Sequence, residues 1–326
     1  MSTYTNGKEE VKDIYQRITD RMVEELKKGH VPWQRPWVQA MNLVSMKPYR
    51  GINTFTIALE EKESPFWMTY KQAVELGGTV KRGEKSTQVI YWNFKDMVDQ
   101  KTGVPILGKN GKPRQIPFIR WANVFNLDQV KDIKAPELEK NTDTRMPLEK
   151  AQEILEKANV CQMRLNGQMD RAVYMPALDA IEVPSIKKFR NGADFYHTVF
   201  HELTHATGHA SRLDREGITQ PIVFGSERYA KEELIAELGA SFLSNDAGIL
   251  GECEFKNSTA YLQSWVKALE SNPKWITAAC TSAQKACQYI QGEREITKSP
   301  REEFEALMAG ADADKQNQPQ NEYERE

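Results

Sequence analysis

Four of the five histidines lie in one short stretch, residues 196–209. The stretch contains the sequence HELTH at positions 201–205, which fits the metal-binding pattern HExxH. On a helix, His201 and His205 lie one turn apart on the same face and can bind one Zn²⁺. Glu202 lies beside them, where its carboxylate can accept a proton from an attacking water. The spacing therefore predicts a zinc-dependent hydrolase site with Glu202 as the catalytic base.

The residues around this motif have the pattern of an amphipathic helix. Phe195, Val199, Leu203 and Ala206 recur at helical spacing, and Gly208 follows as a C-terminal stop. The alternative interpretation is a helix that carries ordinary surface histidines. The helical context favours the metal site.

A catalytic zinc ion usually has three protein ligands, so a third is expected further along the chain. The segment 233–243 is apolar almost all round, and its polar exceptions Glu233, Glu237 and Ser241 are four residues apart on one stripe. A buried carboxylate needs a cation or a donor. We therefore predict that Glu233 is the third ligand and that Glu237 accepts a hydrogen bond from a ligand imidazole. The competing assignment exchanges the two roles and stays open, because sequence fixes helix rotation loosely. A divalent ion other than zinc is also compatible with these ligands.

The cysteines show no metal-binding or disulfide pattern. None of the four forms a CxxC pair, so we expect free thiols at Cys161, Cys253, Cys280 and Cys287.

Two domains are expected to position these residues. A chain of 326 residues is long for one compact domain, and the stretch between Asp128 and Pro147 is polar and charged. We predict an α+β protein with domains at 1–130 and 148–308, a linker at 131–147 and a disordered tail at 309–326.

Periodicity places the elements within these domains. In the N-terminal half it predicts helices at 9–28, 52–61 and 69–76, and an antiparallel pair of strands at 88–94 and 118–125. In the C-terminal half it predicts a helix at 147–158, short strands at 171–174 and 180–183, and mostly helices thereafter. We expect the strand at 180–183 to be a sheet edge that can receive an extended peptide.

The N-terminus has no features of a signal peptide. No stretch approaches the roughly 18 apolar residues of a membrane span. We expect a cytoplasmic protein with no membrane partner.

The two halves differ in charge. Residues 1–134 contain 22 Lys and Arg against 15 Asp and Glu, net +7, and the rest contains 22 against 31, net −9. The basic half also holds five of the seven tryptophans, namely Trp33, Trp37, Trp67, Trp92 and Trp121. Basic residues mixed with aromatic rings are typical of single-strand binders. Composition alone is weak evidence here, because the charge is only mildly basic and Trp92 and Trp121 are core candidates first.

Longer stretches of the sequence resemble those of known protein families. HELTH followed by ELIAE at 233–237 resembles the HExxH plus ExxA(D/E/N) arrangement of gluzincin-type metallopeptidases. HELTHATGHASRLDR and YAKEELIAELGASFL resemble the ArdC antirestriction family, as do VPWQRPW, KPYRGINTF and FWMTYKQAVELGGTVKRGEKST in the opening half. The resemblance implies an N-terminal α+β domain that binds single-stranded DNA and a mostly helical, zincin-like C-terminal domain. It also implies protection of incoming plasmid or phage DNA from host restriction.

With the resemblance, DNA binding becomes the expectation for the basic half. The predicted DNA-contacting residues lie in two Pro/Gly loops and the block between them: Lys47, Tyr49, Arg50, Trp67, Tyr70, Lys71, Lys81, Arg82 and Lys85.

Two functions compete at this stage. The first is a zinc peptidase that cleaves a DNA-bound protein of unknown identity. The alternative is a non-enzymatic protein that coats single-stranded DNA and whose zinc site is structural or vestigial. The intact motif favours the enzyme, because a structural zinc site needs no base.

Overall fold

The computed structural model describes residues 3–99, 102–107, 113, 115–136, 146–220, 226–255 and 259–293. The chain divides into two compact units. Unit 1 comprises Met1–Val38, Arg50–Phe55 and Leu138–Arg294, and unit 2 comprises Gln39–Tyr49, Thr56–Glu137 and Glu295–Glu326. The first 38 residues thus group with the C-terminal half, whereas the sequence suggested one N-terminal domain over 1–130. The predicted tail and most of the predicted linker lie outside the described residues.

Unit 2 is built on a four-stranded sheet of order β1-β2-β5-β4. The long strands β4 (Thr87–Asp96) and β5 (Gln115–Asn126) pair antiparallel, which confirms the predicted hairpin. The short strands β2 (Phe66–Thr69) and β1 (Met41–Asn42) extend the sheet beyond β5. The other elements of unit 2 are the last residues of α2 (Ile52–Ala58), α3 (Tyr70–Glu75), η2 (Leu127–Gln129) and the two-stranded pair β3 (Thr79–Val80) and β6 (Val130–Lys131).

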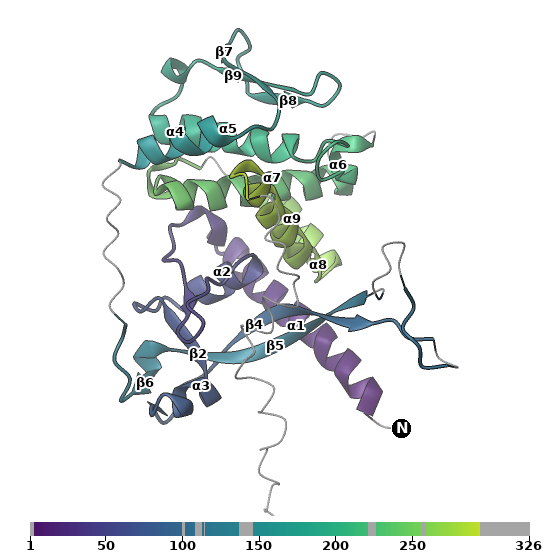
Figure 1. Ribbon diagram of the computed structural model, residues 1–326. Helices are drawn as coiled ribbons and strands as arrows, with labels where there is room; N and C mark the ends of the chain where they lie inside the picture. Colours follow the sequence, from purple (N-terminus) through teal and green to yellow (C-terminus); the bar gives the residue numbers. More distant parts are fainter. Residues whose placement is uncertain are drawn as a thin grey trace, which may run out of the picture. The chain divides into compact units, whose positions relative to one another are not determined.

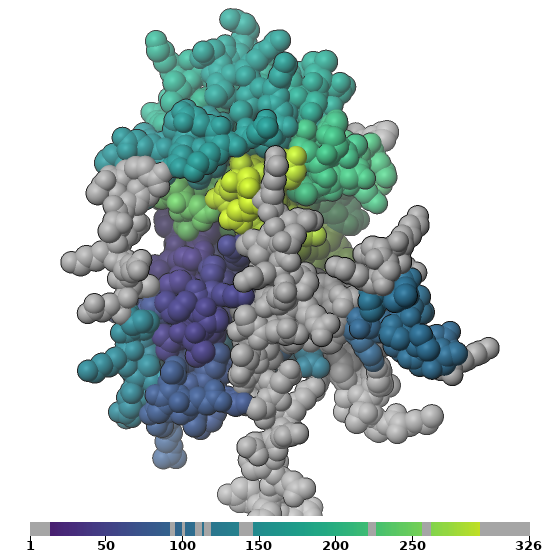
Figure 2. Space-filling view, in the orientation of Figure 1, coloured from purple at the N-terminus to yellow at the C-terminus, as the bar shows by residue number. Residues whose placement is uncertain are grey.

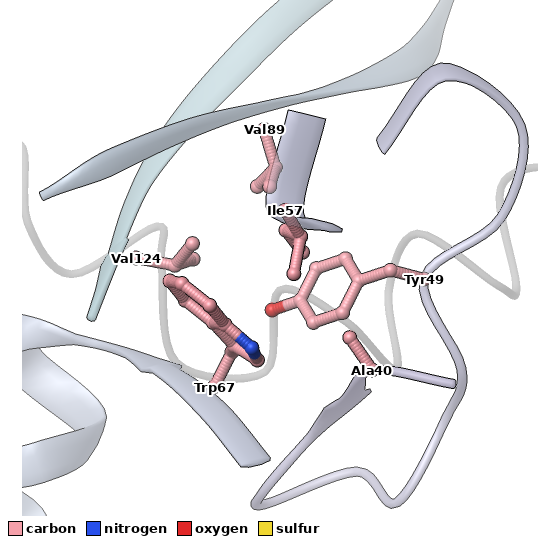
Figure 3. Close-up of a cluster of buried hydrophobic side chains, with 6 residues drawn as sticks. All are labelled: Ala40, Tyr49, Ile57, Trp67, Val89 and Val124. Carbon is pink, nitrogen blue, oxygen red and sulfur yellow. The ribbon is translucent and has the colours of Figure 1, made fainter. Parts of the chain in front are cut away.

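A hydrophobic cluster holds the sheet of unit 2 to the preceding loop (Figure 3). It consists of Ala40, Tyr49, Ile57, Trp67, Val89 and Val124. Tyr49 and Trp67 are only 4% and 1% exposed, so both rings belong to the core. Burial raises the pKa of Tyr49 to about 12, while a hydrogen bond from Asn42 Nδ2 opposes the rise.

Unit 1 combines helices with one small sheet (Figure 1). In chain order its elements are α1 (Thr3–Lys27), η1 (Pro32–Gln34), the first residues of α2 (Ile52–Ala58), α4 (Pro147–Lys157), β7 (Gln162–Gly167), β8 (Val173–Met175), β9 (Ala180–Pro184), η3 (Ile186–Lys188), α5 (Gly192–Ala206), α6 (Glu216–Thr219), α7 (Glu227–Ala247), η4 (Leu250–Glu252), α8 (Thr259–Ser271) and α9 (Trp275–Ile290).

The sheet of unit 1 lies on one side of α5, and α7 runs along the other (Figure 1). In the space-filling view the teal residues of α4 pack directly on the green residues of α7 (Figure 2). The strand order is β7-β9-β8, so β9 is hydrogen-bonded on both sides. The prediction that residues 180–183 form an edge is therefore wrong. The edge strand in contact with α5 is β8.

The N-terminal segment is part of unit 1's core. Along α1 the apolar stripe predicted from the sequence is buried at Ile14, Ile18, Met22 and Leu26. Thr19 Oγ1 donates a hydrogen bond to the carbonyl of Pro273 at 2.7 Å, beyond the end of α8. In the VPWQRPW stretch that follows, Val31, Pro32 and Trp33 are buried as well, so this stretch also packs in unit 1.

All four cysteines are free, as predicted, and two of them are buried. Among the described residues, no helix is long and apolar enough to cross a membrane.

Candidate metal centre

Helix α5 carries the HELTH sequence; it is capped at its start and packs closely against α7. The side chain of Asn191 caps its start by accepting a hydrogen bond from the amide of Asp194 at 2.8 Å. The neighbouring α7 approaches closely at Gly239, where an added Cβ would come within 2.5 Å of Thr204 Oγ1. Because Gly239 has no side chain, the two helices pack tightly, and Glu233 of α7 reaches the imidazoles of α5.

Three potential ligand atoms converge between the helices. His201 Nε2 and His205 Nε2 lie 3.1 Å apart; His201 Nε2 is 3.6 Å from Glu233 Oε2, and His205 Nε2 is 3.6 Å from Glu233 Oε1. Ligand atoms at the corners of a tetrahedron with bonds of ~2.0–2.2 Å are about 3.3–3.6 Å apart. The two nitrogen–oxygen distances lie at the upper end of this range and the two nitrogens are slightly closer than it. One ligand atom from each of the three side chains lies within 4.8 Å of the others, so the group could hold one divalent metal ion.

Glu237 lies on the other side of His201. Its Oε2 is 3.8 Å from His201 Nδ1 and 3.5 Å from His197 Nε2. The group of side chains suited to one metal ion among the described residues is His201, His205 and Glu233, without Glu237. This geometry favours Glu233 as the third ligand and Glu237 as a support for the His201 ring, and both assignments remain predictions.

The catalytic candidate Glu202 is held by the edge strand. Its side chain is buried, and its Oε2 accepts a hydrogen bond of 2.7 Å from the amide of Tyr174 on β8. That amide donates to α5 and not to β9, so it lies on the side of β8 that pairs with no other strand among the described residues. An extended peptide that paired with this edge would lie beside Glu202.

Sequence reasoning missed Glu232. Its side chain is almost fully buried on α7, with Oε1 3.3 Å from His205 Nδ1 and 2.6 Å from Arg215 Nη2. In the sequence, Lys231 and Glu232 resemble the charged, exposed start of a helix. No local pattern distinguishes Glu232, because its partner Arg215 lies 17 positions earlier.

The electrostatics of the site favour a cation. Burial opposes ionisation of the carboxyl groups of Glu232, Glu233 and Glu237, but imidazole and guanidinium neighbours outweigh it and lower each pKa below its ordinary value. Burial alone would lower the pKa of His201, but Glu233 and Glu237 outweigh burial and raise it. The site therefore concentrates ionised carboxylates around two imidazoles, which is a setting that a divalent cation stabilises.

Tyr229 was also left without a role by the sequence. It lies one turn before Glu233 on α7 and hydrogen-bonds to it. Burial raises the pKa of Tyr229 to about 12, and the carboxylates of Glu233 and Glu202 act in the same direction. The phenol is therefore protonated at neutral pH and is a hydrogen-bond donor at the edge of the site.

The predicted DNA-contacting residues are distributed over both units. Tyr49 and Trp67 are buried in the core of unit 2, so the prediction that their rings stack on bases is wrong: neither has a free face. Arg50 belongs to unit 1, where its Nη1 lies 3.6 Å from Glu293 Oε2. Lys47 and Lys71 are half-buried.

Four predicted residues are exposed on unit 2. Tyr70 at the start of α3 is 59% exposed, and Lys81, Arg82 and Lys85 are exposed in the turn between β3 and β4. The buried side chain of Gln129 holds this turn by donating to the carbonyl of Lys85 at 2.9 Å. The backbone of the turn is thus fixed while its basic side chains remain accessible.

The other aromatic residues of the basic half are accounted for by packing. Trp33 is fully buried and Trp37 half-buried in unit 1. Trp121 is half-buried on β5, and the side chain of Trp92 lies outside the described residues.

Comparisons with known families match both parts of the chain. Residues 12–125 match the model for the N-terminal domain of the anti-restriction factor ArdC. Residues 149–282 match the model for a zincin-like metallopeptidase, and this range contains α5 and α7.

Two crystal structures of the antirestriction ArdC protein from the R388 plasmid resemble the chain along most of its length. The metal-free structure is 33% identical, with a TM-score of 0.66, and the match covers 91% of this chain and 98% of that one. The Mn(II)-bound structure is 32% identical, with a TM-score of 0.67, and the match covers 87% and 99%.

Similar sequences occur in larger proteins. Two proteins of Escherichia coli called DNA primase TraC each match 86% of this chain, with sequence identities of 38% and 36%. The chain spans only 27% and 20% of their lengths. Protein y4eC of Sinorhizobium fredii, described as uncharacterized, is 28% identical and is covered over 92% of its length.

Proposed function

Since this chain belongs to the ArdC antirestriction family, we propose that it protects incoming plasmid or phage DNA from host restriction by means of a metallopeptidase site and a surface that binds single-stranded DNA. The observation that carries the peptidase part is the convergence of His201, His205 and Glu233 beside Glu202. A purely structural metal site has no need of a buried carboxylate in that place.

The proposed cofactor is Zn²⁺, held by the two imidazoles and Glu233. When bound, the ion supplies Lewis acidity that polarises a scissile carbonyl and acidifies water. Glu202 accepts the proton of the attacking water, and the Tyr174 amide keeps its carboxylate in place. The Tyr229 phenol hydrogen-bonds to Glu233 and helps to hold that carboxylate in place. The edge of β8 aligns the peptide.

The DNA-binding part of the proposal uses unit 2. Lys81, Arg82 and Lys85 neutralise phosphates, and the ring of Tyr70 stacks on a base. Helix α3 and strand β3 are in contact, so Tyr70 and this turn belong to adjacent elements. DNA binding would bring the peptidase to proteins that act on the same DNA, and such a protein is the proposed substrate.

One comparison tests both parts. Wild type, Glu202→Gln and Tyr70→Ala are assayed for metal content, single-strand affinity and protection of incoming DNA in cells. The proposal expects Glu202→Gln to keep metal and DNA binding and to lose protection. If Glu202→Gln protects as well as wild type, the peptidase is not the basis of protection, and a non-enzymatic coat of single-stranded DNA becomes the explanation.

A further inference from the structure

Glu232 is a buried carboxylate with two partners. Its side chain is only 4% exposed, and a carboxylate in that position is costly unless cations or donors surround it. Its Oε1 faces His205 Nδ1 at 3.3 Å. The opposite nitrogen of the same ring, Nε2, is the atom that faces His201 and Glu233. Glu232 therefore contacts the His205 ring at Nδ1, the nitrogen opposite the one predicted to bind the metal.

Arg215 fixes the plane of this carboxylate. Its Nε lies 3.2 and 3.1 Å from the two oxygens of Glu232, and its Nη2 lies 2.6 Å from Oε1. The same guanidinium donates to Thr207 Oγ1 at 2.7 Å and to the carbonyl of Thr204 at 2.6 Å, at the end of α5. Arg215 thus ties Glu232 of α7 to the last turn of the helix that carries His205.

Two glycines leave the space that this arrangement needs. A Cβ at Gly217 would lie 2.7 Å from Glu232 Oε2, and a Cβ at Gly208 would lie 2.9 Å from Arg215 Nη2. The arginine and the carboxylate are therefore enclosed closely, with little freedom to reorient.

We propose that Glu232, held by Arg215, is a positioning residue for His205: it accepts the Nδ1 proton and so leaves the Nε2 lone pair directed at the metal. The tautomer of a metal-bound imidazole is set by the hydrogen bond of its other nitrogen, and loss of such a partner typically costs 10–100-fold in metal affinity. The inference rests on the proposed function only in taking His205 as a ligand.

The chain contains a matched control for this pair. Arg212 follows α5 in the same turn as Arg215 and also pairs with a carboxylate, Asp179, with a contact of 2.9 Å from Nη1 to Oδ2. Both arginines also donate to backbone carbonyls. The carboxylate of Asp179 hydrogen-bonds to the Tyr174 hydroxyl, whereas that of Glu232 contacts the ligand ring.

The test is a calorimetric titration of the metal-free full chain with ZnCl₂, using wild type, Glu232→Gln, Arg215→Lys and Asp179→Asn. Glu232→Gln is expected to weaken Zn²⁺ binding about 10–100-fold. Arg215→Lys should weaken it less, because lysine keeps the charge but not the two-point contact. Asp179→Asn should lower the melting temperature of the metal-free chain and leave Zn²⁺ affinity within about twofold of wild type, since its carboxylate contacts Arg212 and the Tyr174 hydroxyl instead of a ligand ring.

A folded Glu232→Gln variant that binds Zn²⁺ within about twofold of wild type overturns the inference. So does an Asp179→Asn variant that loses as much affinity as Glu232→Gln, because the effect would then follow general stability. If Glu232→Gln does not fold, ring-nitrogen NMR of the zinc-loaded wild type decides. A slowly exchanging proton on His205 Nδ1 supports the inference, and its absence contradicts it.

These outcomes are separable from those of the proposed function, since none of them uses peptidase activity. A wild-type chain that binds no Zn²⁺ overturns the metal site and this inference together. A chain whose Zn²⁺ affinity depends on Glu232 but that shows no proteolysis overturns the peptidase alone.

Discussion

Trp33 packs edge-on against Trp265, with ring centroids 5.2 Å apart and both side chains at most 1% exposed. Trp33 lies in η1 near the N-terminus, and Trp265 lies on α8, which follows α5 and α7 in the chain. Phe55 joins the same aromatic cluster: it contacts Trp33 edge-on at 6.3 Å and stacks on Phe242 of α7 at 5.2 Å. The N-terminal segment therefore supports the helix that supplies Glu233.

The first prediction concerns this packing. Trp33→Ala removes a fully buried ring and should destabilise the chain by about 3–5 kcal/mol. Urea denaturation measures the loss, and Trp33→Phe should cost less because part of the ring contact remains. A loss below about 1 kcal/mol for Trp33→Ala, the size of an ordinary mutation, would contradict the assigned packing. A fragment that begins at residue 148 should fail to fold for the same reason.

The second prediction separates metal binding from catalysis. Glu202→Gln keeps the shape of the side chain and an oxygen that can accept from the Tyr174 amide. It cannot take a proton, so peptidase activity should fall about 10²–10⁴-fold while Zn²⁺ affinity changes little. Metal analysis and an autoproteolysis or substrate-cleavage assay on the same preparation check this. A Glu202→Gln variant without metal would show that the residue is needed to build the site.

The third prediction decides between the two candidate third ligands. Glu233→Gln replaces the anionic carboxylate ligand by a neutral amide and should abolish tight Zn²⁺ binding, whereas Glu237→Gln weakens a support of His201 and should cost about 10–100-fold. Competition with a chelator measures both. The reverse order of effects would assign the metal to Glu237, which the sequence left as the alternative.

The fourth prediction concerns DNA. Replacing Lys81, Arg82 and Lys85 by Gln should lower single-strand affinity and reduce the salt dependence of binding by up to about 0.7 per lost phosphate contact. Tyr70→Ala should lower affinity by about 1–3 kcal/mol and leave the salt dependence unchanged, because stacking releases no counterions.

Two controls accompany this DNA experiment. Lys267→Gln, at an exposed position on α8, should have little effect. Tyr49→Phe should also retain DNA binding, because the Tyr49 ring is buried. If Tyr49→Phe by itself abolished DNA binding, Tyr49 would have to be counted as a DNA-contacting residue.

The fifth prediction is a pH dependence. Hydrogen bonds from Arg212 lower the pKa of Asp179 to about 2, against the opposing effect of burial. A lowered carboxyl pKa stabilises the fold above the ordinary pKa of 3.8, and the contribution disappears as the pH falls toward 2. The difference in melting temperature between wild type and Asp179→Asn should therefore be constant near neutrality and shrink below about pH 4. A difference that persists at low pH would show that the pair contributes through packing.

The candidate ligands of the site could be predicted from the spacing of residues along the chain. Because an α-helix repeats every 3.6 residues, the spacing of His201 and His205 sufficed to place both rings on one face. The four-residue spacing of Glu233 and Glu237 likewise predicted a helix that presents both carboxylates to the two histidine rings. The β4–β5 hairpin followed from runs of β-branched and aromatic residues, which mark strands locally.

Features that depend on contacts between distant segments could not be predicted from the sequence. Strand order made β9 central and β8 the edge, although both strands look alike in sequence. The partner of His205 proved to be Glu232, because Arg215 approaches it from a turn that no periodicity describes. Tyr49 and Trp67 resembled stacking residues by composition, but the packing of β2 and β5 encloses them. Local spacing fixes which side chains share a face, whereas burial and the choice of partner depend on how the elements pack.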